Sequence, residues 1–148
     1  LDYGINEGRC ANRRILNGIS VASDGKKYYY KNDQIDTSYT GFAAYQGNTY
    51  YVLGGIVSNY TGLINYYGTW YYLQSGSVKW DYTSLVEHSD GAWYYVEKGI
   101  LNWNYNGLVE YYGTLYYIQN GYLNWEYSGR IWYNGKWYKI VNGVAQKD

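Results

Sequence analysis

The segment Gly107–Tyr127, GLVEYYGTLYYIQNGYLNWEY, carries a pattern that most of the remaining chain repeats. Its glycine opening, its Tyr-Tyr pair and its Asn-Trp-x-Tyr ending recur with variations. Further units open at Gly18, Gly41, Gly62, Ser84 and Gly129. Openings about 22 residues apart indicate a repeat architecture, in which one unit cannot bury its apolar face alone and stacks on its neighbours.

Each unit reads as a β-hairpin followed by a return segment. In the last unit, residues 131–133 form a first strand, and Asn134-Gly135 is a two-residue turn that needs positive φ angles. Residues 136–140 form the second strand, and Asn142-Gly143 provides a second turn. The same hairpin-turn position holds Asp24-Gly25, Gln46-Gly47, Tyr67-Gly68, Asp90-Gly91 and Tyr112-Gly113.

The sequence therefore predicts an all-β fold, a β-hairpin solenoid of about six repeats. An isolated hairpin is marginal in water, so stacking of the next hairpin must supply the missing burial. We expect residues 18–148 to form this solenoid as a single domain. Residues 1–17 are expected to be an N-terminal cap or a partial repeat, with a helical turn at Asn12–Leu16.

The composition restricts the function. The net charge is zero, which argues against a general nucleic-acid partner. The sequence has no run of 18 apolar residues, so it predicts no membrane-spanning helix. The single cysteine, Cys10, cannot form an internal disulfide. Because the chain lacks methionine, we expect it to be a piece of a longer protein. Aromatic repeats with almost no cysteine fit an exported bacterial protein. The 25 tyrosines and 7 tryptophans suit a thin core, because their rings are apolar while their tips tolerate water.

The motif G-x-W-Y-Y-x-x-x-G resembles the choline-binding or cell-wall-binding repeats of Gram-positive surface proteins, and most closely a divergent, tyrosine-rich type from gut Firmicutes. It occurs at Gly68–Tyr72 with Gly76, Gly91–Tyr95 with Gly99, Gly113–Tyr117 with Gly121 and, in part, Gly135–Tyr138 with Gly143. The resemblance implies a left-handed superhelix of hairpins. It also implies an exported protein that attaches to a surface, secreted or on the bacterial cell surface.

In that family, aromatic cages between consecutive hairpins hold the ligand. One cage tryptophan follows the opening glycine, and another is the tryptophan of W-Y-Y. Here the second is present at Trp70, Trp93 and Trp137, whereas the unit openings lack the first. Trp80, Trp103 and Trp125 in the return segments are additional and can rebuild a cage at another position.

These aromatic residues are the candidate ligand-binding positions, by sugar stacking or by cation–π attraction to a quaternary ammonium. The alternative is that the W-Y-Y tryptophans are core residues between hairpins. The complete candidate set is Trp70, Trp80, Trp93, Trp103, Trp125, Trp137, Tyr72, Tyr95 and Tyr117.

No catalytic, metal or cofactor site is predicted. Glu87, His88, Ser89 and Asp90 are adjacent on a hairpin turn, and neighbouring turn residues do not converge as a nucleophile, base and orienting group must. We therefore expect His88 to be a solvated turn residue. The remaining carboxylates are scattered, with no cluster of metal ligands.

The sequence thus favours a non-catalytic binding module. Its expected partner is a cell-wall polysaccharide, or a choline-like or other glycan ligand, held through repeated weak sites. The alternative is an adhesin that binds a host secreted glycoprotein, such as an immunoglobulin or a mucin, through tyrosine-rich surfaces, or a structural stalk.

Overall fold

The computed structural model describes residues 14–147, and these residues contain β-strands but no helix. They divide into two compact units, one up to Ser58 and one from Asn59. The first unit has strands β1 (Gly18–Val21), β2 (Lys27–Lys31), β3 (Gln34–Ile35), β4 (Gly41–Tyr45), β5 (Asn48–Leu53) and β6 (Ile56–Val57). Whether residues 18–148 behave as one domain stays a prediction.

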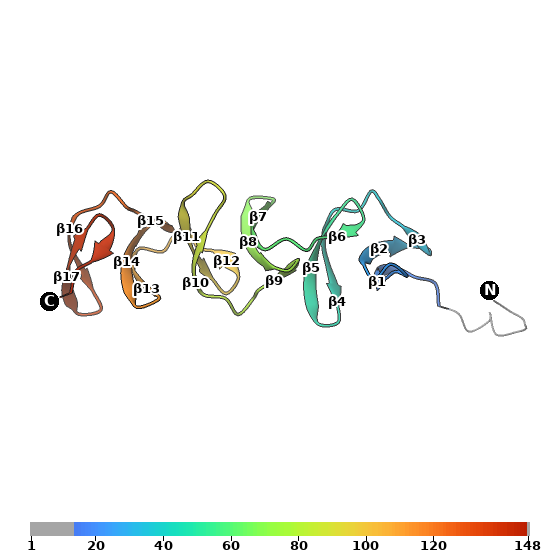
Figure 1. The fold of residues 1–148 in the computed structure, drawn as a ribbon, viewed down its shortest axis with the longest axis horizontal. Coiled ribbons are helices and arrows are strands. Elements are labelled where there is room, and N and C mark those ends of the chain that lie inside the picture. The colour runs from blue at the N-terminus through green and yellow to red at the C-terminus, as the bar shows by residue number, and fades with distance from the viewer. Residues whose placement is uncertain (1–13, 148) are drawn as a thin grey trace, which may run out of the picture. The chain divides into compact units, whose positions relative to one another are not determined.

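The second unit contains four repeats of the same strand triplet (Figure 1). Its strands are β7 (Gly62–Tyr66), β8 (Thr69–Gln74), β9 (Ser77–Val78), β10 (Ser84–Glu87), β11 (Trp93–Glu97), β12 (Ile100–Leu101), β13 (Gly107–Tyr111), β14 (Thr114–Gln119), β15 (Tyr122–Leu123), β16 (Gly129–Tyr133), β17 (Lys136–Val141) and β18 (Val144–Ala145). This arrangement confirms the predicted all-β fold of β-hairpin repeats about 22 residues long. The left-handed sense of the superhelix rests on the family resemblance and stays a prediction.

In the second unit, the short third strands β12, β15 and β18 join neighbouring repeats. β12 pairs with β11 of its own hairpin and also with β8 of the preceding hairpin, where Ile100 faces Tyr71. β15 and β18 make the corresponding pairings with β11 and β14. One backbone hydrogen bond repeats at each joint, as in Tyr72 N–H to Gly99 O at 2.8 Å. Repeats in the second unit are therefore linked by backbone as well as by side chains.

The start of the first unit repeats a second kind of contact, in which the end of one segment accepts hydrogen bonds from a later turn. Leu16 O accepts a hydrogen bond from Asp33 N–H at 3.0 Å, and Asn17 Oδ1 accepts one from Asn32 N–H at 2.9 Å. Tyr60 and Thr61 bond in this way to the Ser75-Gly76 turn. Leu16 and Asn17 thus make the contacts that the end of a return segment makes elsewhere. Whether residues 1–17 are a cap or a partial repeat stays a prediction. Cys10 and the first two residues of the helical turn expected at Asn12–Leu16 lie outside the described residues, and residues 14–16 form no helix.

The hairpin turns follow the predicted chemistry, with one refinement. Most are two-residue turns with both φ angles positive, such as Asn134 (51°) and Gly135 (79°). The turns at Asp24 and Asp90 are longer by one residue. There His88 N–H donates to Ala92 O, and only Gly91 has a positive φ. A three-residue loop with a left-handed glycine in its last position is the next commonest hairpin connection.

The core of the second unit is thin and continues from one repeat to the next. One cluster contains Leu63, Val86, Val96 and Leu101, and a second contains Leu85, Ile118 and Leu123. Each takes apolar side chains from consecutive hairpins, and half-buried aromatic rings pack around it. Stacking therefore supplies the burial that a single hairpin lacks.

Two glycines with nearly equal φ angles allow the effect of backbone strain to be measured apart from the effect of steric contact. A Cβ on Gly121 (φ +82°) would lie 2.6 Å from Asn102 O, whereas one on Gly113 (φ +86°) would have nothing within 4 Å. We expect Gly113→Ala to lower the free energy of unfolding by about 1–2 kcal/mol through left-handed strain. Gly121→Ala should cost a further ~1–3 kcal/mol, because the backbone of the preceding repeat must shift. Urea denaturation measures both, and equal losses would contradict the close approach of these repeats.

Candidate functional site: aromatic pockets between successive hairpins

A small pocket lies where the β10–β11 hairpin meets the β7–β8 hairpin; we call it the first aromatic pocket. Its volume is about 110 Å³. Its lining residues are Leu63, Trp70, His88, Asp90, Tyr94, Leu101 and Trp103. The two leucines are buried core residues, whereas Trp103 is 45% exposed. The pocket therefore has an apolar floor, aromatic walls and one wall that faces water.

An equivalent pocket lies one repeat further along the chain; we call it the second aromatic pocket. Its volume is about 120 Å³. Its lining residues are Leu85, Trp93, Tyr111, Tyr116, Leu123 and Trp125. Trp93 meets Tyr111 edge-on with ring centroids 5.3 Å apart, and Tyr116 meets Trp125 at 5.7 Å. Four aromatic rings thus surround a cavity well below the 300–1,000 Å³ of a drug-sized site.

The repeat explains why these side chains converge. The first tryptophan comes from the second strand of one hairpin: Trp70 on β8, and Trp93 on β11. The next hairpin supplies a tyrosine from its own second strand, Tyr94 or Tyr116. The return segment after the third strand supplies the exposed tryptophan, Trp103 or Trp125. Because the third strand pairs with both hairpins, it carries the return tryptophan to the joint.

The two pockets differ at one wall. His88 occupies in the first pocket the position that Tyr111 occupies in the second, and its ring meets Trp70 edge-on at 5.3 Å. The expectation that His88 is a solvated turn residue is wrong, because its half-buried ring lines a pocket.

Asp90 adds a charge to the first pocket. Its carboxylate accepts hydrogen bonds from Ala92 N–H at 2.9 Å and from the Tyr94 hydroxyl at 3.0 Å. The bond from Ala92 N–H is the largest cause that holds the pKa of Asp90 below its usual value. Burial, followed by the hydrogen bond to Asp90, raises the pKa of Tyr94. The first pocket therefore carries a carboxylate that stays ionised, whereas the residues lining the second pocket carry no charge.

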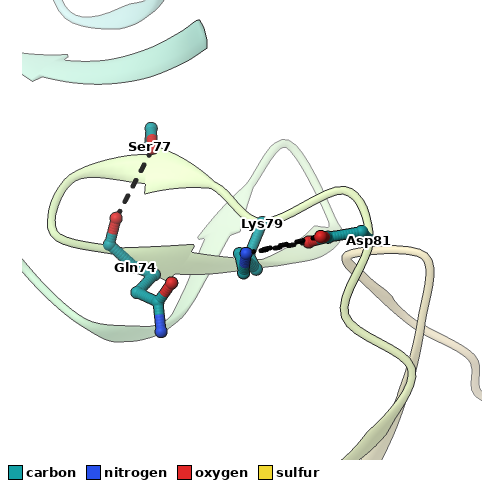
Figure 2. A network of polar contacts seen from close by, with 4 residues as sticks. All are labelled: Gln74, Ser77, Lys79 and Asp81. Atoms are coloured by element: carbon teal, nitrogen blue, oxygen red, sulfur yellow. Dashed lines mark hydrogen bonds and ion pairs between the residues drawn. The ribbon is translucent and has the colours of Figure 1, made fainter.

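Trp80 is the corresponding return tryptophan of the β7–β9 repeat and is 47% exposed. It meets Tyr71 edge-on at 6.2 Å. The residues on either side of it form an ion pair, Lys79 Nζ to Asp81 Oδ1 at 3.1 Å (Figure 2). A surface ion pair of this kind adds little to stability, so we regard it as a local restraint on the return segment. A ligand-binding role for Trp80 stays a prediction.

The joint between β14 and β17 is different in charge and size. There Leu115 replaces the first tryptophan, and Lys147 replaces the return tryptophan. The cavity is about 740 Å³ and is lined by Gly113, Thr114, Leu115, Lys136, Trp137, Tyr138, Val144, Ala145, Gln146 and Lys147. Arg130 lies over the Trp137 ring at 4.6 Å, and Lys136 lies over the Tyr138 ring at 5.0 Å. Since the protein's own cations cover these rings, a cationic ligand is disfavoured here.

Tyr72, Tyr95 and Tyr117 do not line these cavities. Each lies against the tyrosine that ends its own return segment, as Tyr95 does against Tyr105 with centroids 4.3 Å apart. The Tyr105 hydroxyl donates to Leu108 O at 2.7 Å, and Tyr82 makes the same bond to Leu85 O. Burial is the main cause that raises the pKa of Tyr95, Tyr105 and Tyr117. Their surroundings are those of packing residues at the joint, and their predicted contact with ligand stays untested.

Within residues 14–147, no group of three or more histidine, cysteine or acidic side chains is placed to hold a metal ion. A search of the same residues for a helix long and apolar enough to cross a membrane finds none. The sequence analysis placed Trp70, Trp93, Trp103 and Trp125 among its candidates, and the structure brings them together in pairs. It missed His88, Asp90, Tyr94, Tyr111 and Tyr116. Tyr94 and Tyr116 precede their return tryptophans, Trp103 and Trp125, by the same number of residues, and this spacing is the signal that could have identified them.

Stacked β-hairpins that enclose aromatic pockets at their joints define a class of repeat protein, and comparison with known proteins identifies the family. Residues 38–58, 59–79, 81–102 and 104–124, more than half of the chain, match the choline-binding repeat. The chain belongs to the choline-binding repeat family. This confirms the resemblance found in the sequence.

Solved structures of similar proteins include choline binding protein F from Streptococcus pneumoniae. It is 24% identical, with 88% of this chain and 42% of that chain covered and a TM-score of 0.40. CbpJ from the same species is 25% identical, with coverages of 82% and 42% and a TM-score of 0.41. The chain thus spans less than half the length of these relatives. No curated protein matches the chain.

Proposed function

We propose that this chain is a non-catalytic attachment module that binds choline-like quaternary ammonium groups of a cell-wall polymer. The two aromatic pockets of the second unit are its ligand sites. The observation that carries the proposal is the second pocket, where Trp93, Tyr111, Tyr116 and Trp125 surround a cavity of about 120 Å³. Membership of the choline-binding repeat family supports it independently.

The chemistry of the second pocket suits a quaternary ammonium. Such a group has no N–H to donate, so a lining without a carboxylate acceptor costs it little. Each ring face within about 6 Å contributes roughly 0.5–2 kcal/mol by cation–π attraction. The methyl groups also bury apolar surface against Leu85 and Leu123. A small site of this kind binds weakly.

Two equivalent pockets in one unit compensate for weak individual sites. When a polymer carries the ligand group many times, the second contact is intramolecular, and avidity exceeds the affinity of either site. A surface location and an exported parent protein are part of this proposal, because attachment to a wall polymer requires both.

The alternative function also has an observation in its favour. Tyr67 and Tyr112 are 92% and 90% exposed at equivalent hairpin turns. The ring of the preceding tyrosine contacts each of them edge-on, with ring centroids 4.6 Å apart. Exposed tyrosines are frequent in protein-recognition surfaces. An adhesin that binds a host secreted glycoprotein through these turns is the second candidate.

Retention on immobilised choline separates the two candidates. We expect the protein to be retained at moderate ionic strength and eluted by free choline, but not by sodium chloride at the same concentration. Elution by salt as readily as by choline would show simple ion exchange and contradict the proposal. Removal of the exposed rings by Tyr67→Ala and Tyr112→Ala should leave retention unchanged, because neither residue lines a pocket.

A further inference from the structure

The two aromatic pockets are built on one geometry but differ in polarity. Trp70 and His88 in the first pocket have the same 5.3 Å centroid distance as Trp93 and Tyr111 in the second. The interplanar angles, 76° and 65°, are also similar. The exchange of a tyrosine for a histidine therefore changes the chemistry of one wall while it keeps the shape.

The histidine makes that wall more polar at a cost in stability. The Nδ1 atom of His88 is buried and has no hydrogen-bond partner among the described residues. A buried polar atom without a hydrogen-bond partner destabilises the folded state. The half-buried Tyr111 ring of the second pocket brings no such atom into the joint. Packing alone thus does not explain the histidine.

The carboxylate of Asp90 is held beside this histidine by the turn. Its two oxygens accept from Ala92 N–H and from the Tyr94 hydroxyl. A carboxylate offers about four acceptor positions, so it can take further N–H donors from a bound group. Its exposed position lets a ligand reach it. A fixed, ionised acceptor at the edge of an aromatic pocket pairs with ammonium N–H groups through charge-assisted hydrogen bonds.

These features predict that the two pockets prefer different kinds of ammonium group. An ammonium that keeps one or more N–H groups loses hydrogen bonds to water when it enters a pocket whose lining offers no carboxylate, and that loss opposes binding. In the first pocket, Asp90 replaces part of the lost hydration. A quaternary ammonium gains no hydrogen bond from Asp90, because it has no N–H.

We propose that the first aromatic pocket prefers protonated amines that retain N–H, such as ethanolamine or an amino sugar, while the second prefers quaternary ammonium groups. This inference rests on the proposed function, since both pockets must bind cations. One module would then bind two kinds of amine on its target polymer.

The test measures each pocket separately in the complete chain. The indole N–H signals of Trp103 and Trp125 report on the first and second pockets, and Trp→Phe variants assign them. Choline, N,N-dimethylethanolamine, ethanolamine and glucosamine are titrated in turn, followed by heteronuclear NMR. We expect choline to bind most tightly at Trp125, and ethanolamine or dimethylethanolamine to bind more tightly than choline at Trp103. Comparison of ethanolamine with glucosamine distinguishes a simple headgroup from an amino sugar.

The decisive variant is Asp90→Asn. Asparagine keeps an oxygen that can accept from Ala92 N–H but removes the charge, so the turn should survive. We expect the affinity of the first pocket for ethanolamine to fall about tenfold, with choline affinity at Trp125 unchanged. Asp24→Asn is the matched control, because Asp24 makes the same two bonds, to Lys26 N–H and Tyr28, in a turn of the first unit.

His88→Tyr is the second variant, and it converts one wall of the first pocket to that of the second. We expect it to raise the affinity of the first pocket for choline relative to ethanolamine. The same ligand order at both pockets, or an unchanged order in Asp90→Asn, would overturn the inference but leave the proposed function standing. Absence of binding by any amine at both tryptophans would instead contradict the proposed function.

Discussion

Trp125→Ala is expected to weaken choline binding at the second aromatic pocket about tenfold while the protein stays folded. The side chain supplies one ring of the pocket, and a cation–π contact contributes roughly 0.5–2 kcal/mol, where 1.4 kcal/mol corresponds to tenfold in affinity. Because the residue is 46% exposed, its truncation leaves no large internal cavity. We expect the midpoint of thermal unfolding to change by less than about 4 °C. Isothermal titration with choline and calorimetric melting measure the two effects.

Trp132→Ala is the matched control for this substitution. Trp132 is 60% exposed and lies on β16, outside both pockets. Its removal should change neither choline affinity nor, by more than a few degrees, the melting temperature. If Trp125→Ala lowers stability as strongly as it lowers affinity, Trp125 is a packing residue, and its assignment to a ligand site is wrong. Trp103→Ala gives the same comparison for the first pocket.

Leu85→Ala is expected to cause the largest loss of stability. Leu85 is 1% exposed and belongs to the cluster with Ile118 and Leu123, residues of the following repeat. Truncation of a buried leucine costs about 2–5 kcal/mol, depending on how far the cavity collapses. A domain has a total stability of only about 5–15 kcal/mol, so the second unit should be close to unfolding. Urea denaturation followed by tryptophan fluorescence measures the change.

Leu53→Ala provides the corresponding exposed substitution. Leu53 is 61% exposed at the end of β5, and its truncation should change the free energy of unfolding by no more than about 0.5 kcal/mol. A comparable loss in both variants would mean that Leu85 does not pack between repeats. That result would contradict the description of stacking as the source of the core.

The fold was predictable because the repeat fixes it in several independent ways. Glycines at hairpin turns, such as Gly135, predict the strand ends, and the period predicts stacking. The double pairing of β12 was not predictable, because a two-residue strand such as Ile100–Leu101 leaves almost no pattern in sequence. The long turn at Asp90 was also missed, since Asp90-Gly91 resembles the two-residue turns of the other repeats.

The candidate site was predictable only in part. Tryptophans stood out by their rarity, and Trp70, Trp93, Trp103 and Trp125 do line pockets. Sequence alone could not tell which of the many tyrosines face them, because strand alternation gives two faces but not the neighbour that covers each. His88 was missed for the same reason, since the preceding hairpin that buries it lies 18 residues away at Trp70.

A crystal structure of the protein soaked with choline tests the central claim most directly. The account predicts a trimethylammonium group in the second aromatic pocket, in contact with Trp93, Tyr111, Tyr116 and Trp125, and none over Trp137, where Arg130 covers the ring. Choline bound elsewhere while this pocket stays closed by its own side chains would contradict it.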